Sequence, residues 1–76
     1  MSEKLPRVTA EEVIKVLEHA GFLLSRQSGS RKIYKNQEGK RVTVPYHSGK
    51  TLHPKLLKSI LRDAGLTIEQ FKDMLT

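Results

Sequence analysis

The sequence of 76 residues contains no cysteine, no tryptophan and only two phenylalanines and two tyrosines. The lack of cysteine excludes disulfide bridges, thiolate zinc sites and cysteine nucleophiles, and it fits a reducing compartment. The longest apolar run, Phe22-Leu23-Leu24, is far shorter than the roughly 20 residues of a membrane span, and the N-terminus lacks the apolar segment of a signal peptide. We therefore expect a soluble, cytoplasmic protein with no membrane partner.

The short length leaves room for one thin core. Two domains would need roughly 100 residues or more, and a chain of this size buries only about 60% of the surface that its unfolded form exposes. We expect residues 1–76 to form a single domain, with residues 1–7 flexible. A deep substrate cavity is not expected.

Acidic side chains are nearly absent from the middle of the chain. Residues 26–62 hold ten basic side chains and one acidic side chain, Glu38, for a net charge of +9, whereas residues 1–25 and 63–76 carry −1 and −2. Such a concentrated positive block favours a polyanionic partner, and nucleic acid is the leading class. The alternative is an ordinary lysine-rich solvated surface.

Three helices are predicted from residues typical of helix ends. The segment Thr9-Ala10-Glu11-Glu12 has the Ser/Thr-x-x-Glu spacing of a capping box, in which the threonine and glutamate side chains bond each other's free backbone N–H groups. Gly21 ends this first helix. Pro54 fits the first turn of a second helix that Gly65 ends, and Thr67-Ile68-Glu69-Gln70 repeats the box before a short third helix.

Three strands are predicted between the first two helices, at about residues 22–26, 31–35 and 41–44, because period-two patterns alternate there with turn residues. An antiparallel meander with helices packed on one face follows, which is an α+β fold of order α-β-β-β-α with a short C-terminal helix. Besides the helical stripes, the predicted core contains Phe22, Leu24, Ile33, Val42 and Val44. The other face of the sheet is expected to be polar.

Three ordered segments carry a family resemblance. They are Gly21-Phe22 with residues 27–34 (QSGSRKIY), residues 42–47 (VTVPYH) and residues 57–66 (LKSILRDAGL). This set, within about residues 9–71, resembles the HicA family of toxins, the mRNA interferases of HicAB toxin–antitoxin pairs. The resemblance implies a dsRBD-like fold, that of double-stranded RNA-binding domains. It also implies endoribonuclease action on mRNA without a metal or other cofactor, and neutralisation by a HicB-like antitoxin that covers the active face, with the toxin monomeric alone or in a heteromeric complex.

One position departs from the family pattern. A histidine taken to be catalytic typically follows the Gly-Ser pair, whereas Gly29-Ser30 is followed here by Arg31. Metal-free RNA cleavage needs a group that takes the 2′-hydroxyl proton, which imidazole does near neutrality and guanidinium does not, although guanidinium still binds phosphate. We expect a chain that binds RNA but cleaves it weakly or not at all. The substitution is either natural or introduced.

Three histidines remain to be interpreted. His19 lies near the end of the first helix, where an imidazolium complements the helix dipole, and His53 is interpreted as a surface or packing residue. His47, a second candidate catalytic residue, lies beside Ser48-Gly49-Lys50, where phosphate could approach the backbone. Substrate contact, replacement of the missing base and a structural hydrogen bond all stay open for His47. No metal site is predicted, because the histidines lack close ligand spacing.

The candidate RNA-binding side chains come from the hairpin, the following loop and the second helix. They are Ser30, Lys32, Lys35, Lys40, Arg41, Lys50, Lys55, Lys58 and Arg62. Shape-based binding of A-form RNA uses such phosphate contacts without base reading. Tyr34 and Tyr46 either stack bases or pack. The alternative function is a non-catalytic RNA-binding or antitoxin-binding module of the same fold, and a protein-only adaptor is a third class.

Overall fold

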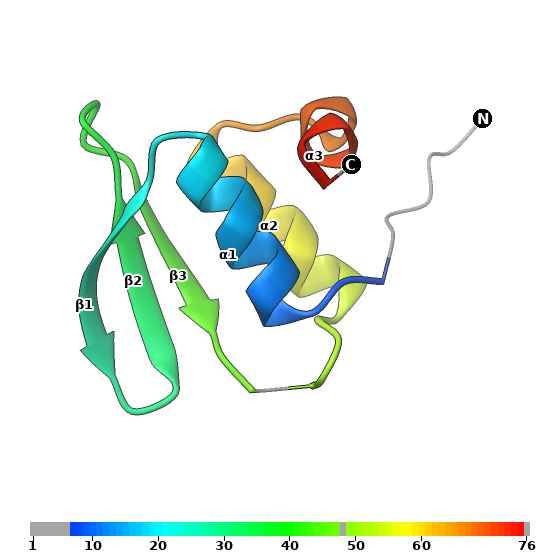
Figure 1. The fold of residues 1–76 in the computed structure, drawn as a ribbon, viewed down its shortest axis with the longest axis horizontal. Helices are drawn as coiled ribbons and strands as arrows, with labels where there is room; N and C mark the ends of the chain where they lie inside the picture. The colour runs from blue at the N-terminus through cyan, green and yellow to red at the C-terminus, as the bar shows by residue number, and fades with distance from the viewer. Residues whose placement is uncertain (1–6, 48, 76) are drawn as a thin grey trace.

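The computed structural model describes residues 7–47 and 49–75. Its elements are α1 (Ala10–His19), β1 (Leu23–Ser28), β2 (Arg31–Lys35), β3 (Arg41–Pro45), α2 (Pro54–Ala64) and α3 (Ile68–Leu75). The strands form an antiparallel sheet in the order β1-β2-β3, and the helices gather on one side of it (Figure 1). The predicted α+β fold is confirmed. The prediction for residues 1–7 falls, apart from the exposed Arg7, outside the described residues.

Both predicted capping boxes are present, and they fix where α1 and α3 begin. The Glu12 N–H donates to Thr9 Oγ1 at 3.2 Å, and the Thr9 N–H donates to Glu12 Oε1 at 2.9 Å. At α3, the Gln70 N–H donates to Thr67 Oγ1 at 3.1 Å and the Thr67 N–H to Gln70 Oε1 at 2.9 Å. Each pair satisfies two backbone donors that a helix start otherwise leaves without partners.

The ends of α2 also follow their local chemistry. His53 is the N-cap, with its Nδ1 accepting from the Lys55 N–H at 3.1 Å, and Pro54 takes the first helical position. Gly65 ends the helix in the left-handed conformation, at φ +73°. The predicted limits of this helix are confirmed. His53, for which a surface or packing role was expected, caps the start of the helix.

The register of β2 on β3 decides which side chains face the helices. Tyr34 pairs with Val42 and Lys32 with Val44, so these four residues share the helix-facing side. Ile33 therefore lies on the opposite, open face of the sheet. Its predicted place in the core is wrong, because Tyr34, only 3% exposed, fills that place instead.

The prediction for Leu24 was wrong as well. Leu24 pairs with Tyr34 and so faces the helix side, yet its side chain is 49% exposed. The reason is that β1 is an edge strand, whereas α1 and α2 pack over β3 at the other edge. Leu23, on the open face through its pairing with Lys35, is 73% exposed, so the open face is not wholly polar.

The core lies between the helices and the inner face of β2 and β3. Its largest fully buried side chains are Phe22, Phe71, Leu17, Leu57 and Ile60. The loop before α2 is fixed to the segment before α1, because the Leu52 N–H donates to the Val8 carbonyl oxygen at 2.8 Å and Thr9 forms a β-bridge with Thr51. These contacts position the residues that enter α2.

Candidate nucleic-acid interface

Arg31 is the first residue of the central strand. It follows the two-residue turn Gly29-Ser30, and it pairs with Ser28 of β1 on one side and Pro45 of β3 on the other. The Tyr46 N–H donates to the Ser30 carbonyl oxygen at 2.6 Å, which extends the pairing past the end of β3. The Arg31 backbone is therefore held from both sides, and its exposed side chain lies on the open face of the sheet.

Three further cations share that face. Lys35 lies there because it is two residues beyond Ile33, Arg41 because it pairs directly with Lys35, and Arg26 because it pairs with Ile33. We call Arg26, Arg31, Lys35 and Arg41 the open-face cations; all four are exposed. Like charges directly opposite each other destabilise a sheet, so a bound polyanion would relieve the Lys35–Arg41 pair. These residues form the candidate RNA-binding surface.

Arg26 is missing from the set predicted from the sequence. The register between β1 and β2 shifts between Leu24 and Arg26, so one extra residue of β1 is accommodated there. This bulge places Arg26 opposite Ile33 on the open face. In the sequence, the only signal for Arg26 is its place in the central block, residues 26–62, where basic residues outnumber acidic residues by ten to one.

Lys32 and Lys40, two of the predicted RNA-binding residues, lie elsewhere. Lys32 shares the helix-facing side with Val44, and its Nζ lies 4.1 Å from the centroid of the Tyr46 ring. Lys40 reaches the C-terminal end of α2, where its Nζ occupies the space that a Cβ on Gly65 would need. A cation at that end complements the helix dipole. Each of these two lysines therefore has a structural neighbour.

Tyr34 is not placed for base stacking, because its side chain is buried among core residues. Burial raises the pKa of its phenol above the ordinary value of 10.0, with smaller contributions in the same direction from Glu18 and Tyr46. Tyr46 is half-buried and already has Lys32 over its ring. Of the two roles left open for Tyr34, base stacking and packing, its burial supports packing.

The exposed side of α2 carries a second group of cations. Lys55, Lys58 and Arg62 line, together with Ser59, a shallow hollow of about 310 Å³. Their spacing of three and four residues puts them on one side of the helix, and Lys58 and Arg62 flank the half-buried Ser59. The three predicted α2 cations thus share one surface.

Two of the histidines lie together at the start of α2. His47 and His53 line a cleft of about 260 Å³ that also contains Lys50. The Lys50 N–H donates to the His47 carbonyl oxygen at 3.1 Å, which holds these two residues close together. Ser48, expected beside His47, lies outside the described residues.

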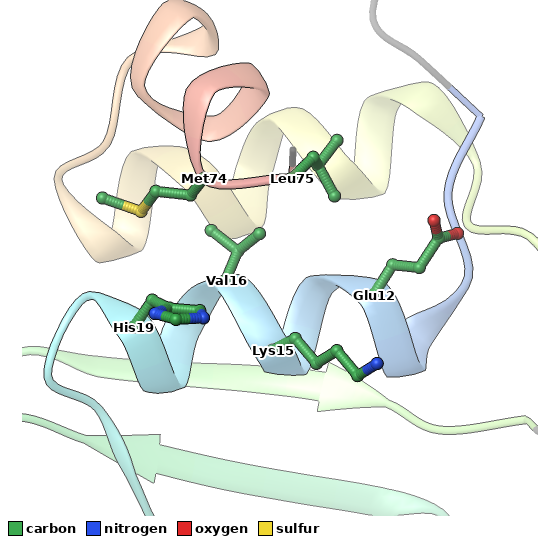
Figure 2. Close-up of a pocket in the computed structure, with 6 residues that line it drawn as sticks. All are labelled: Glu12, Lys15, Val16, His19, Met74 and Leu75. Atoms are coloured by element: carbon green, nitrogen blue, oxygen red, sulfur yellow. The ribbon is translucent and has the colours of Figure 1, made fainter.

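The third histidine, His19, lies in a different hollow, between α1 and α3. Figure 2 shows His19, Glu12 and Lys15 on α1, with Met74 and Leu75 of α3 opposite them. This hollow, of about 250 Å³, contains charges of both signs and two apolar side chains from α3. His19 is thus separate from the cleft that holds the other two histidines.

Metal and membrane sites can be assessed for the described residues. Over residues 7–47 and 49–75, no three histidine, cysteine or carboxylate side chains are grouped so that they could hold a metal ion. Over the same part of the chain, no helix combines the length and the apolar character needed to cross a membrane.

Together, the described residues form an α+β fold with a cationic surface suited to a polyanion. Comparison with models of known protein families matches residues 10–66, or 57 of the 76 residues, to the HicA toxin of bacterial toxin–antitoxin systems. The chain belongs to the HicA toxin family. It is therefore a toxin of a toxin–antitoxin system, from a family of nucleases whose members have an antitoxin as partner. No curated protein matches the chain.

Proposed function

We propose that this HicA-family protein binds mRNA in the cytoplasm through its open sheet face and that Arg31 weakens or abolishes its endoribonuclease activity. The observation that carries the proposal is the place of Arg31. Arg31 lies at the start of the central strand and shares the open face with three other cations. The resemblance of residues 27–34 to the family gives it the position of the family histidine.

The chemistry of RNA cleavage explains why the position matters. Metal-free cleavage removes the proton from a ribose 2′-hydroxyl, forms a bond from that oxygen to phosphorus, and protonates the leaving 5′-oxygen. Guanidinium keeps its proton over the whole pH range in which proteins work and cannot accept the first proton. Its donors can still bond the phosphate oxygens and stabilise charge that develops on them. Binding is therefore retained better than turnover, which falls by a factor on the order of 10² to 10⁴.

The open face also suits the antitoxin. A HicB-like partner with acidic groups over Arg26, Arg31, Lys35 and Arg41 would compete with RNA for the same four charges. Because no carboxylate among the described residues pairs with these four cations across the sheet register, we propose an external anion as their partner. We propose that neutralisation works by covering this face, as the dsRBD-like arrangement of one helix-covered and one open sheet face permits.

A second candidate function is a non-catalytic RNA-binding or antitoxin-binding module. Arg31 itself favours this candidate, since a permanently charged side chain stands where a proton-transfer group is expected. Replacing Arg31 by histidine distinguishes the two candidate functions, because a module that lacks the rest of a catalytic site would gain no cleavage activity from the imidazole.

The experiment compares wild type with Arg31→His on a defined mRNA in the presence of a metal chelator. We expect Arg31→His to cleave at least 10²-fold faster than wild type, with similar RNA affinity. The matched control is Lys35→His, which places an imidazole on the same strand and face but two residues away. If Arg31→His binds RNA without faster cleavage, or if Lys35→His gains as much activity, the role given to position 31 is wrong.

A further inference from the structure

We propose that the cleft between the end of β3 and the start of α2 is a second phosphate-binding subsite, where His47, Lys50 and His53 hold the sugar-phosphate backbone of RNA. We call it the histidine cleft. The inference rests on the proposed RNA-binding function and adds a site that is separate from the open sheet face.

The lining of the histidine cleft has the composition of an anion site. It consists of Pro45, His47, Lys50, Thr51, Leu52, His53 and Leu56. None of these described residues is acidic, and the first turn of α2 adds no acidic residue. Three nitrogen-bearing side chains thus stand beside apolar groups. The three side chains are exposed, so a phosphate can reach their nitrogens, and N–H groups bind an ionised oxygen more strongly than a neutral one.

The helix cap determines which nitrogen of His53 can donate. Its Nδ1 accepts a hydrogen bond from the Lys55 N–H at 3.1 Å and therefore carries no proton. In a neutral imidazole the remaining proton is then on Nε2, which makes Nε2 a donor and not an acceptor. The bond that starts α2 thus prepares His53 to donate to an anion.

The backbone around the cleft is fixed by contacts with a distant segment. The Leu52 N–H donates to the Val8 carbonyl oxygen at 2.8 Å, and Thr51 pairs with Thr9. Thr51 and Leu52 lie between His47 and His53 in the sequence, so these contacts fix the segment that leads into α2. A site held in this way loses little conformational freedom when a ligand binds.

The cleft also connects the two groups of cations. Pro45, which lines it, is the register partner of Arg31, one of the open-face cations. His53, at its other side, directly precedes the hollow of Lys55, Lys58 and Arg62. One RNA backbone could therefore run from the open face, past the histidine cleft, to α2.

The test uses nuclear magnetic resonance of the three imidazoles at constant pH. The probes are inorganic phosphate and a hexauridylate with 2′-O-methyl groups, which lacks the nucleophile for cleavage. We expect the His47 and His53 resonances to shift along one saturation curve with each probe, while those of His19, in the hollow between α1 and α3 (Figure 2), stay unchanged. Equal shifts of all three histidines, or no shift of His47 and His53, would overturn the proposal.

Two variants separate the binding role from the structural role of His53. His53→Asn keeps an N-cap acceptor and removes the Nε2 donor, whereas His53→Ala removes both. We expect His53→Asn to bind the hexamer about tenfold more weakly at a nearly unchanged melting temperature. Lys72→Gln, which removes one exposed charge from α3, is the control and should change the affinity much less. If His53→Asn binds like wild type, the cleft is not a phosphate subsite.

The outcomes distinguish this inference from the proposed function. If the hexamer binds and perturbs Arg31 and Arg41 but neither His47 nor His53, the histidine cleft fails and the open-face proposal stands. If the hexamer does not bind at all, the proposed RNA function fails, and the phosphate titration alone then decides whether the cleft binds an anion.

Discussion

The Nζ atom of Lys32 lies 4.1 Å from the centroid of the Tyr46 ring, on the side of the sheet that faces the helices. Tyr46 also donates its backbone N–H to the Ser30 carbonyl oxygen at 2.6 Å. These two contacts are made by the residues immediately before and after Arg31. The position of Arg31 on the open face is therefore supported from the opposite face of the same strand.

The Lys32–Tyr46 contact should be measurable in a double-mutant cycle. We expect Lys32→Met and Tyr46→Leu to be non-additive, with a coupling free energy of about 0.5–1 kcal/mol in the free energy of unfolding, because the two groups are only partly desolvated. Urea denaturation of wild type, both single variants and the double variant gives this coupling. Strictly additive effects would mean that the cation contributes nothing to the fixed position of Tyr46.

Neighbouring cations of the hairpin should behave differently on RNA. Arg41→Gln removes an open-face cation, so the slope of log K against log salt should fall by about 0.7 to 0.9 for one lost phosphate contact. Lys40→Gln, one residue earlier, should leave that slope unchanged and lower the free energy of unfolding by about 0.3–1 kcal/mol, because Lys40 lies at the C-terminal end of α2. Salt titrations of binding and urea denaturation check both. Equal losses of slope would show that Lys40 contacts RNA as well.

Burial of the Tyr34 phenol should make the fold sensitive to alkaline pH. Burial, and then Glu18 and Tyr46, raise the pKa of Tyr34 in the folded protein, so the folded state disfavours the phenolate. The free energy of unfolding is then unaffected by this group below the ordinary pKa of 10.0 and decreases as pH rises from there toward the raised value. Tyr34→Phe should lose less stability over that window than wild type, by denaturation at a series of pH values. Parallel losses would contradict a raised pKa.

The end of α2 should tolerate asparagine better than alanine. Gly65 adopts φ +73°, a conformation that costs alanine about 1 kcal/mol and asparagine less. A Cβ at this position also displaces Lys40, which can move because the overlap involves the far end of a flexible side chain. We expect Gly65→Ala to lower the free energy of unfolding by about 1 kcal/mol and Gly65→Asn by less, as measured in urea. A larger loss for asparagine would mean that backbone conformation is not what selects glycine here.

The helix ends could be predicted from sequence because their chemistry is local. Thr9 with Glu12, and Thr67 with Gln70, interact within one turn, so four consecutive residues contain the whole interaction. The face assignments of Leu24 and Ile33 could not be read in this way. They depend on the strand register and on the position of the helices over β3, which are properties of the assembled fold.

The candidate site likewise has some features that the sequence predicts and others that only the fold determines. The excess of positive charge in the central block, and Arg31 within it, could be read directly from the sequence. The sorting of the cations between the open face, the Tyr46 ring and the end of α2 could not, since it requires the pairing of distant residues. The bulge that brings Arg26 to the open face cannot be recognised from the pattern of polar and apolar residues in β1. The grouping of His47 with His53 depends on the loop that is held in place at Leu52.

The bulge in β1 has a consequence for the behaviour of the protein at high concentration. All six residues of this edge strand are exposed, and two of them are the apolar Leu23 and Leu24, a combination that invites other chains to add strands and grow fibrils. The register shift directly after Leu24 interrupts the regular spacing of backbone donors and acceptors, and Arg26 then adds a charge. A strand from another chain could pair with β1 over only a few residues before its backbone hydrogen bonds no longer matched. The bulge therefore protects this exposed, partly apolar edge from self-association.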